Sequence, residues 1–295
     1  MPVLQRVSVS IKNILLASDL SSASDTAASY AKGLALNFRS AVEIAHVSDP
    51  SPSVVTSYME SILGLPVKEK QHVSNDNLGR LQKEFTDAGI EACTSLPQGH
   101  RPHITLLNLA KEHDTDLIVA GTHSKWGLER LIVGSTAEEL IRNATCPVLT
   151  VGPHARQPQD GPLVFRTIVY ATDFSPEAAK AAVFALSFAQ DSGARIYFCY
   201  IADSKATPEE RKSLDAPFKA ALKKMIPEQT YEWCSPETVV EHGDAAEGIL
   251  KLSDRVHADL IVLGARNASF WLKHIEHGLT PDLLAEATCP VMTVC

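Results

Sequence analysis

Asp116-Leu117-Ile118-Val119-Ala120-Gly121 is a short apolar run that ends in a glycine. An apolar run of this length, followed by a turn residue, predicts a parallel strand that is buried on both faces. A segment with the pattern of a helix follows it and ends before Cys146-Pro147. A strand, a glycine turn and a helix in this order indicate an α/β fold.

The residues from Gly121 to Thr136 also suit an anionic ligand. Gly121 permits a sharp turn after the strand. Gly134, Ser135 and Thr136 are expected to open the next helix, where free backbone N–H groups, a hydroxyl and the positive end of the helix dipole would face an anion. The stretch therefore predicts a phosphate-binding turn, and a nucleotide site is the first hypothesis.

The chain contains this arrangement twice. Three stretches recur in the same order, and they pair as 14–21 with 168–175, 116–121 with 259–264, and 146–151 with 289–294. A run rich in proline and glycine, 152–162, separates the two copies and is typical of a linker. We expect one domain over residues 1–152, a linker over 153–164, and a second domain over 165–295.

Each copy alternates buried-strand patterns with helical patterns. In the first copy we expect strands at 13–17, 41–47, 91–96, 117–120 and 148–151, helices at 23–36, 75–88, 103–112 and 135–143, and an irregular insert at 49–73. Ser21 or Ser22 is expected to cap the first helix. Parallel neighbours need crossover connections, so the alternation implies two tandem α/β domains, each a doubly wound, five-stranded parallel sheet.

In the second copy, proline disturbs the pattern at two places. A helix over 209–225 is expected to be interrupted at Pro217. Two stretches, 231–234 and 238–241, both alternate as a third strand would, and Pro236 between them favours a break or a bulge.

The last strand of each copy follows a proline, Pro147 or Pro290. Proline cannot donate a ladder hydrogen bond, which favours a place at the edge of a sheet. Two short apolar edge strands in one chain can pair with each other, so we expect 148–151 to pack against 291–294 across a pseudo-twofold axis.

Composition limits the classes of function. The chain has 295 residues, 45% of them hydrophobic, with 27 basic against 35 acidic residues and a formal net charge of -8. This charge disfavours nucleic acid and anionic membranes as partners. No segment approaches the ~18 consecutive apolar residues of a membrane span, and we expect a cytoplasmic protein. The six cysteines have no C-x-x-C spacing, so buried, reduced thiols are expected.

Four features together resemble the universal stress protein family. They are a strand that ends at Asp19, a strand that ends at His46-Val47, the stretch from Gly121 to Thr136, and the sequence Cys-Pro-Val at the end of each copy. The family's nucleotide signature is a glycine, two residues, a second glycine, nine residues, and then Gly-Ser or Gly-Thr. The first copy has Ser124 in place of the second glycine and matches the signature at its other positions.

The resemblance implies a flavodoxin-like or Rossmann-like fold that, in one subclass of the family, binds ATP at the carboxyl ends of the strands. By position, Asp19 and the backbone at Val47 would contact adenine and ribose, and Gly121 would lie near the ribose and the first phosphate. The residues implied to wrap the phosphates, with Mg²⁺ or Mn²⁺ shared by phosphate oxygens, are Thr122, His123, Ser124, Lys125, Gly134, Ser135 and Thr136. We expect no catalytic residue and no metal site made by protein ligands alone.

The second copy departs further from this signature. Its weak counterparts of the implied site are Asp173, Ile201, Gly264, Asn267 and Gly278. Asn267 replaces the second glycine, and Gly278 follows a histidine where the first copy has Gly134-Ser135. Phe270 and Trp271 would fill the turn. We therefore expect a nucleotide in the first copy and none in the second.

Some of these residues have simpler explanations. Asp19 and Asp173 each precede a helix, so both suit a capping or turn carboxylate; we favour function for Asp19 and capping for Asp173. The histidine pairs have the spacing of a shared helix face, but they lack a neighbouring carboxylate or thiol and are expected to be solvated; they are His100 with His103 and His274 with His277.

Three functional hypotheses follow. The first is a stress-response regulator that binds ATP or a related adenine nucleotide and turns it over slowly or not at all, since no P-loop and no G-x-S-x-G elbow is present. The second is a module without nucleotide that binds a partner protein or a small apolar ligand. The third is an enzyme for an adenylated or phosphorylated substrate. An internal pseudo-dimer is expected in each case, with a further homodimer left open.

Overall fold

The computed structural model describes residues 8–48, 68–122, 134–202, 208–264 and 279–295. The chain forms two compact units. The first, here called the N-terminal unit, contains Ile11–Gly121 and Gln157–Leu163. The second, the C-terminal unit, contains Met1–Ser10, Thr122–Arg156 and Val164–Cys295. The C-terminal unit therefore includes two pieces of the first copy, and the N-terminal unit includes part of the predicted linker.

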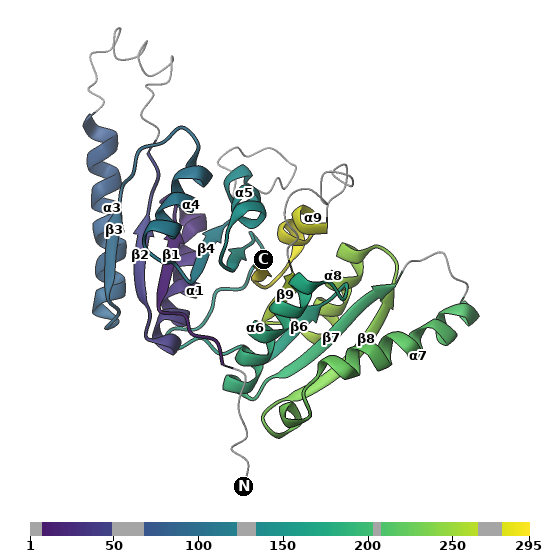
Figure 1. Ribbon diagram of the computed structural model, residues 1–295. Coiled ribbons are helices and arrows are strands. Elements are labelled where there is room, and N and C mark those ends of the chain that lie inside the picture. The colour runs from purple at the N-terminus through teal and green to yellow at the C-terminus, as the bar shows by residue number, and fades with distance from the viewer. Residues whose placement is uncertain (1–7, 49–67, 123–133, 203–207, 265–278) are drawn as a thin grey trace. The chain divides into compact units, whose positions relative to one another are not determined.

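The N-terminal unit has a parallel sheet in the order β3-β2-β1-β4. Its apolar centre is β1, where Leu15 and Leu16 are fully buried. Figure 1 shows α3 beside β3. In chain order its elements are β1 (Asn13–Ala17), α1 (Ser22–Phe38), β2 (Ala41–Ala45), α3 (Lys68–Asp87), β3 (Ala92–Ser95), α4 (Pro102–Glu112) and β4 (Leu117–Gly121).

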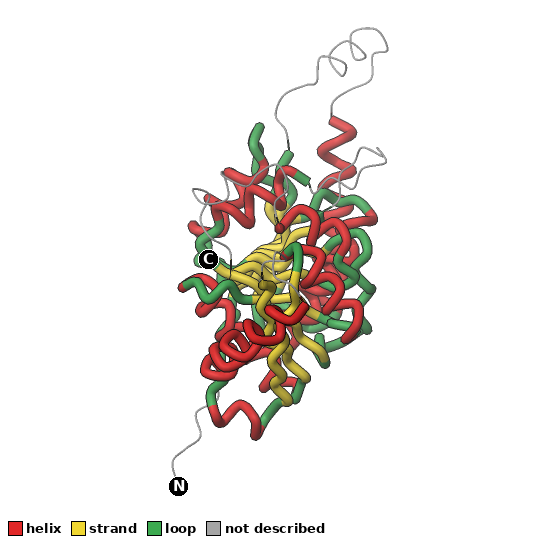
Figure 2. The backbone as a smooth tube through the Cα atoms, turned by 90° about the vertical axis from the view of Figure 1, so that its right-hand side faces the viewer, coloured by secondary structure: helices red, strands yellow, loops and turns green. Residues whose placement is uncertain are grey.

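The C-terminal unit has strands in the order β5-β10-β9-β6-β7-β8. In Figure 2, helices lie on both sides of the strands, which agrees with strands whose neighbouring side chains point to opposite faces and are buried on both. Its elements are α5 (Ser135–Asn143), β5 (Val148–Val151), β6 (Thr167–Ala171), α6 (Pro176–Ser192), β7 (Arg195–Ala202), α7 (Pro208–Met225), the 3₁₀ helix η1 (Glu228–Glu232), β8 (Ser235–His242), α8 (Ala245–Val256), β9 (Leu260–Gly264), α9 (Leu279–Glu286) and β10 (Val291–Val294).

The last strands of the two copies pair with each other, which confirms the predicted contact. β5 and β10 are antiparallel, with Leu149 opposite Met292. All four residues of both strands are buried. The hydroxyl of Thr150 donates to the carbonyl oxygen of Val291 at 2.9 Å, and that of Thr293 donates to Val148 at 3.4 Å. The pair thus satisfies its buried hydroxyls within itself.

The aspartate before the apolar run has a structural role in both copies. Oδ2 of Asp116 accepts from the backbone N–H groups of Lys12 and Asn13 at 2.7 and 3.0 Å. Oδ2 of Asp259 accepts from Arg166 and Thr167 at 2.8 and 3.0 Å. Each carboxylate therefore closes the amino end of the strand next to its own, which explains why the repeat begins at this residue.

Several boundaries differ from those predicted. β2 ends at Ala45, before the expected 47, and α3 begins at Lys68, inside the stretch expected to be irregular. Ser21 is the N-cap of α1, but its side chain makes no capping hydrogen bond. Its hydroxyl donates to Asp19 instead, so the expected cap is part of a turn.

The two prolines of the second copy disturb the backbone less than predicted. α7 runs without interruption through Pro217. The third strand is β8, which contains Pro236 opposite Ile196, and the stretch 228–232 is a 3₁₀ helix. β8 is an edge strand in the sheet. Proline is tolerated in an edge strand because such a strand forms ladder hydrogen bonds on only one of its two sides.

The cysteine prediction is partly wrong. All six cysteines are free, and Cys199, Cys234 and Cys289 are buried. Burial raises the pKa of Cys199 and of Cys289 to about 12 in each case. Cys93, however, is exposed on the edge strand β3, and its pKa is raised as well, by partial burial and by the carboxylate of Glu43. The pKa values of Cys234 and Cys295 are raised by burial too, which is the opposite of the lowered pKa of a reactive cysteine.

The segments before the two matching first strands cross to the opposite copy. The backbone N–H of Val9 donates to the hydroxyl of Ser187 on α6 at 3.1 Å. The backbone N–H of Leu163 donates to the carbonyl oxygen of Gly33 on α1 at 3.2 Å. Val9 and Leu163 hold corresponding positions in the repeat, and so do Gly33 and Ser187. The segment before the first strand of each copy therefore contacts the first helix of the other copy, and these two segments are called arms below.

The arm formed by Gln157–Leu163 lies close along α1. Besides the bond at Leu163, the amide of Gln157 donates to Ser29 at 2.6 Å and Lys32 lies 3.9 Å from Asp160. A Cβ placed on Gly33 would lie 2.9 Å from Cβ of Leu163. The absence of a side chain at Gly33 is what lets this arm pack closely. Residues 157–163 of the predicted linker are therefore a packed part of the N-terminal unit.

Replacing Gly33 by alanine should lift this arm from α1. The added methyl group collides with Leu163, and we expect the amide of Leu163 to exchange with solvent about tenfold faster, corresponding to a loss near 1.4 kcal/mol. Hydrogen exchange of the intact protein measures this. Gly79→Ala in α3 is the matched control, because a Cβ there has no heavy atom within 4 Å. Equal exchange rates in the two variants would contradict the prediction.

Candidate functional site at the carboxyl ends of the strands

Asp19 lies in a tight turn between β1 and α1. Its Oδ1 accepts from the backbone N–H of Ser21 at 3.0 Å, and from the hydroxyls of Ser21 and Ser24. The hydroxyl of Ser18 accepts from the N–H of Leu20, which has a positive φ of 58°. The turn explanation of Asp19 is therefore supported by direct contacts.

The second copy builds the same turn. The hydroxyl of Thr172 accepts from the N–H of Phe174, whose φ is 60°. Oδ1 of Asp173 accepts from the N–H of Ser175 at 2.9 Å, and Ser175 caps α6 through the N–H of Ala178. The prediction that Asp173 supports the start of a helix agrees with these contacts.

The residues expected on the adenine and ribose side gather at one edge of the N-terminal unit. Asp19, Val47 and Gly121 follow or end β1, β2 and β4, which are neighbours in the sheet. His46 fixes the connection between two of these strand ends, since its Nδ1 lies 2.9 Å from the carbonyl oxygen of Ser18. Val47 and Gly121 are half-buried.

The residues expected near the phosphates begin the C-terminal unit. Thr122 is buried, and its backbone N–H donates to the carbonyl oxygen of Val151 at 3.1 Å. Its own carbonyl oxygen accepts from the N–H of Gly134 at 3.2 Å. Gly134 is the N-cap of α5 and offers no capping side chain, and Ser135 in the first turn is exposed. The N-cap of α5 thus contributes no side chain to the first turn, and Ser135 contributes an exposed hydroxyl.

Some predicted residues fall outside the described part of the chain. They are His123, Ser124, Lys125, Asn267, Phe270, Trp271 and Gly278.

The one acidic residue in the first turn of α5, Glu138, forms an ion pair with Arg142 one turn later. This pairing moderates the repulsion that a carboxylate near the start of α5 would exert on an anion.

In the second copy, Gly264 is required for packing. It ends β9, and a Cβ there would lie 2.4 Å from the backbone nitrogen of Ala178 and 2.6 Å from the carbonyl carbon of Glu177. The first turn of α6 therefore occupies the space beside this glycine. Ile201, another weak counterpart, packs against α8, where its Cδ1 would lie 2.9 Å from a Cβ on Gly248. Both residues support helix packing.

Replacing Gly264 by alanine should destabilise the protein by about 2 kcal/mol, because backbone atoms of α6 must move to admit the methyl group. Chemical denaturation followed by circular dichroism measures the loss. The affinity of the first copy for ATP should not change. A loss of affinity that exceeds the loss of folded protein would show that Gly264 contributes to nucleotide binding.

A separate polar cluster in the N-terminal unit joins β2, β3 and the C-cap residue of α4. Glu43 accepts from the hydroxyl of Ser95, and its Oε2 lies 2.6 Å from Nδ1 of His113. The hydrogen bond and charge of Glu43 raise the pKa of His113. Within the described residues, no group of three or more His, Cys, Asp and Glu side chains could hold a metal ion. The cluster is thus an ion pair that depends on pH.

The stabilisation from this pair should disappear as the pH rises. A raised histidine pKa in the folded state adds stability that is fully present below the unfolded value of about 6.5 and is lost as pH passes the folded pKa. His113 is half-exposed, so we expect His113→Gln to cost less than about 1 kcal/mol at pH near 5.5 and nothing at pH near 8.5. Urea denaturation at the two pH values tests this, and an equal cost at both would contradict it.

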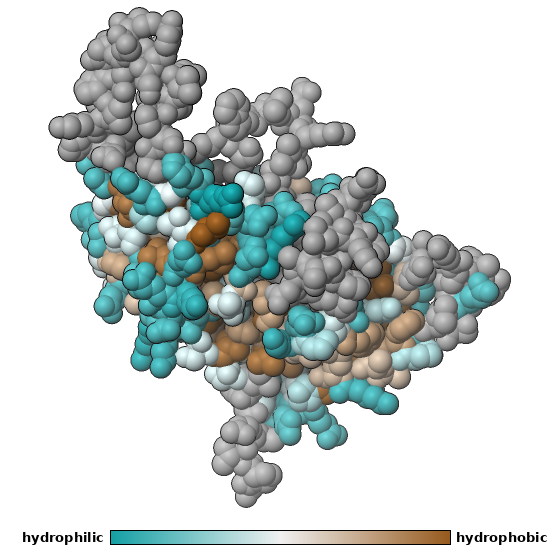
Figure 3. All heavy atoms as spheres, turned by 45° about the horizontal axis from the view of Figure 1, so that its top comes forward, coloured by the Kyte–Doolittle hydropathy of each residue, from teal (hydrophilic) through white to brown (hydrophobic). Residues whose placement is uncertain are grey.

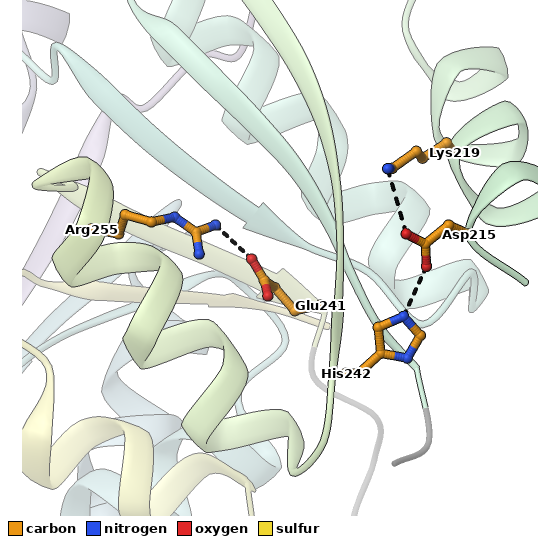
Figure 4. Close-up of polar contacts among 5 residues, drawn as sticks. All are labelled: Asp215, Lys219, Glu241, His242 and Arg255. Atoms are coloured by element: carbon orange, nitrogen blue, oxygen red, sulfur yellow. Dashed lines mark hydrogen bonds and ion pairs between the residues drawn. The ribbon is translucent and has the colours of Figure 1, made fainter. Parts of the chain in front are cut away.

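No pattern in the sequence indicates one further pair of residues, Asp215 and His242. Nε2 of His242, at the end of β8, lies 2.8 Å from Oδ1 of Asp215 on α7 (Figure 4). Lys219 lies 3.5 Å from the other carboxylate oxygen. Asp215 and Lys219 are four residues apart, a spacing that predicts an ion pair on one face of a helix. Their partner on a distant strand could not be read from that spacing.

Comparison with known proteins identifies the class to which this fold and this signature belong. The model of the universal stress protein family matches residues 10–152 and again 165–294. The chain therefore belongs to the universal stress protein family, with two family domains in tandem.

Individual relatives agree with this assignment. A universal stress protein of Methanocaldococcus jannaschii is 36% identical over 143 residues, which cover 48% of this chain and 81% of the relative. A putative universal stress protein of Staphylococcus aureus is 31% identical over 172 residues, covering 58% and 93%. The crystal structure of a universal stress protein from Archaeoglobus fulgidus covers 98% of both chains with a TM-score of 0.71 and 17% identity, which supports the fold.

No helix in the described residues is both long enough and apolar enough to cross a membrane.

Proposed function

We propose that the chain is a stress-response regulator that binds ATP, or a related adenine nucleotide, through its first copy. The observation that supports this most directly is the place of the signature glycines. Gly121 is the last residue of β4, and Gly134 is the N-cap of α5. A strand end followed by an open helix N-terminus is where doubly wound sheets bind phosphate groups.

The neighbouring residues suit the remaining parts of such a ligand. Asp19 and Val47 stand at adjacent strand ends of the same sheet edge, on the side proposed for adenine and ribose. Thr122, the residue after Gly121, accepts a hydrogen bond from Gly134, the N-cap of α5. In this proposal Mg²⁺ or Mn²⁺ binds mainly through phosphate oxygens, since ATP supplies the charge that such cations need.

Turnover is proposed to be slow or absent. A general base must reach the attacking water with a free acceptor. The stretch from Gly121 to Thr136 does not end in Gly-Lys-Ser or Gly-Lys-Thr, as a P-loop does, and Oδ1 of Asp19 accepts from Ser21 and Ser24 within the turn after β1. Nucleotide binding would therefore act by changing assembly or the choice of partner. A cytoplasmic location and dimers between copies of the chain belong to the same proposal.

Gly134→Val should abolish ATP binding. Gly134 has φ -60° and ψ 131°, which valine adopts without strain. The branched side chain would instead cover the N–H groups of the first turn of α5. For the unmodified protein we expect a dissociation constant in the micromolar range, corresponding to about 8 kcal/mol of binding free energy. Calorimetry with Mg²⁺ and then Mn²⁺ measures both proteins.

The melting temperature of Gly134→Val without ligand serves as the control, and it should change little because the backbone conformation is ordinary. If the unmodified protein gives no heat and no thermal shift with ATP and either metal, the proposal is wrong. Multiple turnovers by protein free of contaminating ATPase would overturn the part that concerns catalysis.

A further inference from the structure

Ser24, in the first turn of α1, is hydrogen-bonded to Asp19 twice. Its hydroxyl donates to Oδ1 of Asp19 at 2.5 Å and accepts from the backbone N–H of the same residue at 3.3 Å. Ser24 is buried, with 7% of its surface exposed. It therefore holds both the backbone and the carboxyl group of Asp19, and it does so away from bulk water, where a hydrogen bond is stronger.

Ser21 holds the same carboxyl group. Its backbone N–H donates to Oδ1 of Asp19 at 3.0 Å, and its hydroxyl donates to the same oxygen. Oδ1 thus accepts hydrogen bonds from three donors of the described turn. Bonds to a carboxylate are among the strong ones, so the three together fix the orientation of the whole group, including the direction of Oδ2.

Both serines give up local helix stability for this contact. Ser21 is the N-cap of α1, yet its side chain makes no capping hydrogen bond, although such a bond would stabilise the helix. Ser24 stands in the first turn, where alanine is the better helix former. Departures from the locally favourable choice are expected at functional sites, where the contact serves another purpose.

The second copy makes the opposite choice at both positions. Ser175 corresponds to Ser21, and its hydroxyl accepts from the N–H of Ala178 and caps α6. Ala178 itself corresponds to Ser24 and has no hydroxyl to offer Asp173. The turn and the helix nevertheless form in this copy. The fold therefore does not require a hydroxyl at the position of Ser24.

Surface hydropathy does not identify a residue of this kind. On the face that Figure 3 draws, hydrophobic residues are interrupted by hydrophilic ones. Ser24 is small, polar and buried, so its role follows from its hydrogen bonds and from the difference between the two copies.

We propose that Ser24 is a positioning residue for nucleotide binding in the first copy, which holds the carboxylate of Asp19 in the orientation that meets the nucleoside part of the ligand. This inference rests on the proposed function of that copy. A carboxylate can only accept hydrogen bonds, so it meets the donors of the nucleoside, which are the amino group of adenine and the hydroxyls of ribose. Without Ser24 the carboxylate must be ordered on binding, which lowers the affinity.

Ser24→Ala gives the first copy the residue that the second copy has. Calorimetry of the intact protein with Mg²⁺ should show about tenfold weaker binding of ATP, as expected for the loss of one hydrogen bond to a charged group. The matched control is Ser29→Ala, because Ser29 is also on α1 but its hydroxyl contacts Asp25 and Gln157. The control should bind ATP as the unmodified protein does.

A double-mutant cycle distinguishes positioning from a general effect on the fold. In Asp19→Ala protein, adding Ser24→Ala should change the affinity for ATP by less than about twofold, because the carboxylate that Ser24 orients is already absent. Ligand-observed NMR titration measures the weaker affinities. Circular dichroism melting verifies that each variant is folded.

Two results would overturn the inference alone. The first is equal affinity for ATP in Ser24→Ala and in the unmodified protein. The second is the same loss of affinity with and without the carboxylate of Asp19, because the effect of Ser24 would then not pass through that group. Absence of ATP binding by the unmodified protein is a different outcome, which overturns the proposed function and this inference with it.

Discussion

The antiparallel pairing of β5 with β10 is the interaction on which the rest of this molecule depends. Each strand is the last of its copy, is only four residues long, and is buried throughout. A strand this short and apolar is unstable as an exposed edge and is prone to pair with other chains. By pairing with each other, the two strands remove both edges, and Thr150 and Thr293 satisfy their hydroxyls on the opposite backbone.

This pairing gives the second copy a structural role that does not depend on the nucleotide signature. The first copy needs a partner strand at β5, and the second copy supplies it within the same chain. The two arms also link the copies, because Val9 is hydrogen-bonded to Ser187 and Leu163 is hydrogen-bonded to Gly33. Loss of either copy would leave the other with an open strand edge and an uncovered first helix. Selection on assembly alone can therefore preserve the second copy.

The sequence predicted those parts of the fold that depend on local pattern. Apolar runs such as Leu117–Gly121 gave the buried strands, and the duplicate runs gave the pairing of β5 with β10. Patterns failed where a distant contact decides the outcome. Pro217 remains inside α7, a helix that is also held to the sheet by Phe218 and Asp215. Lys68 begins α3 in a polar stretch where no apolar stripe marks the start.

In the candidate sites, too, a sequence pattern does not reveal the contacts that each residue makes. The glycines Gly121 and Gly264 are equivalent in the repeat, and a signature treats them alike. In the second copy the glycine is needed because the backbone of α6 lies 2.4 Å from where its Cβ would be. A glycine in this motif can therefore be retained for helix packing whether or not a phosphate is bound. The copies differ at the N-cap of α5, which offers no capping side chain, and at the turn after β6, where the ring of Phe174 packs on that of Tyr200. Each copy therefore has different chemistry at the carboxyl ends of its strands, and the shared glycine does not reveal that difference.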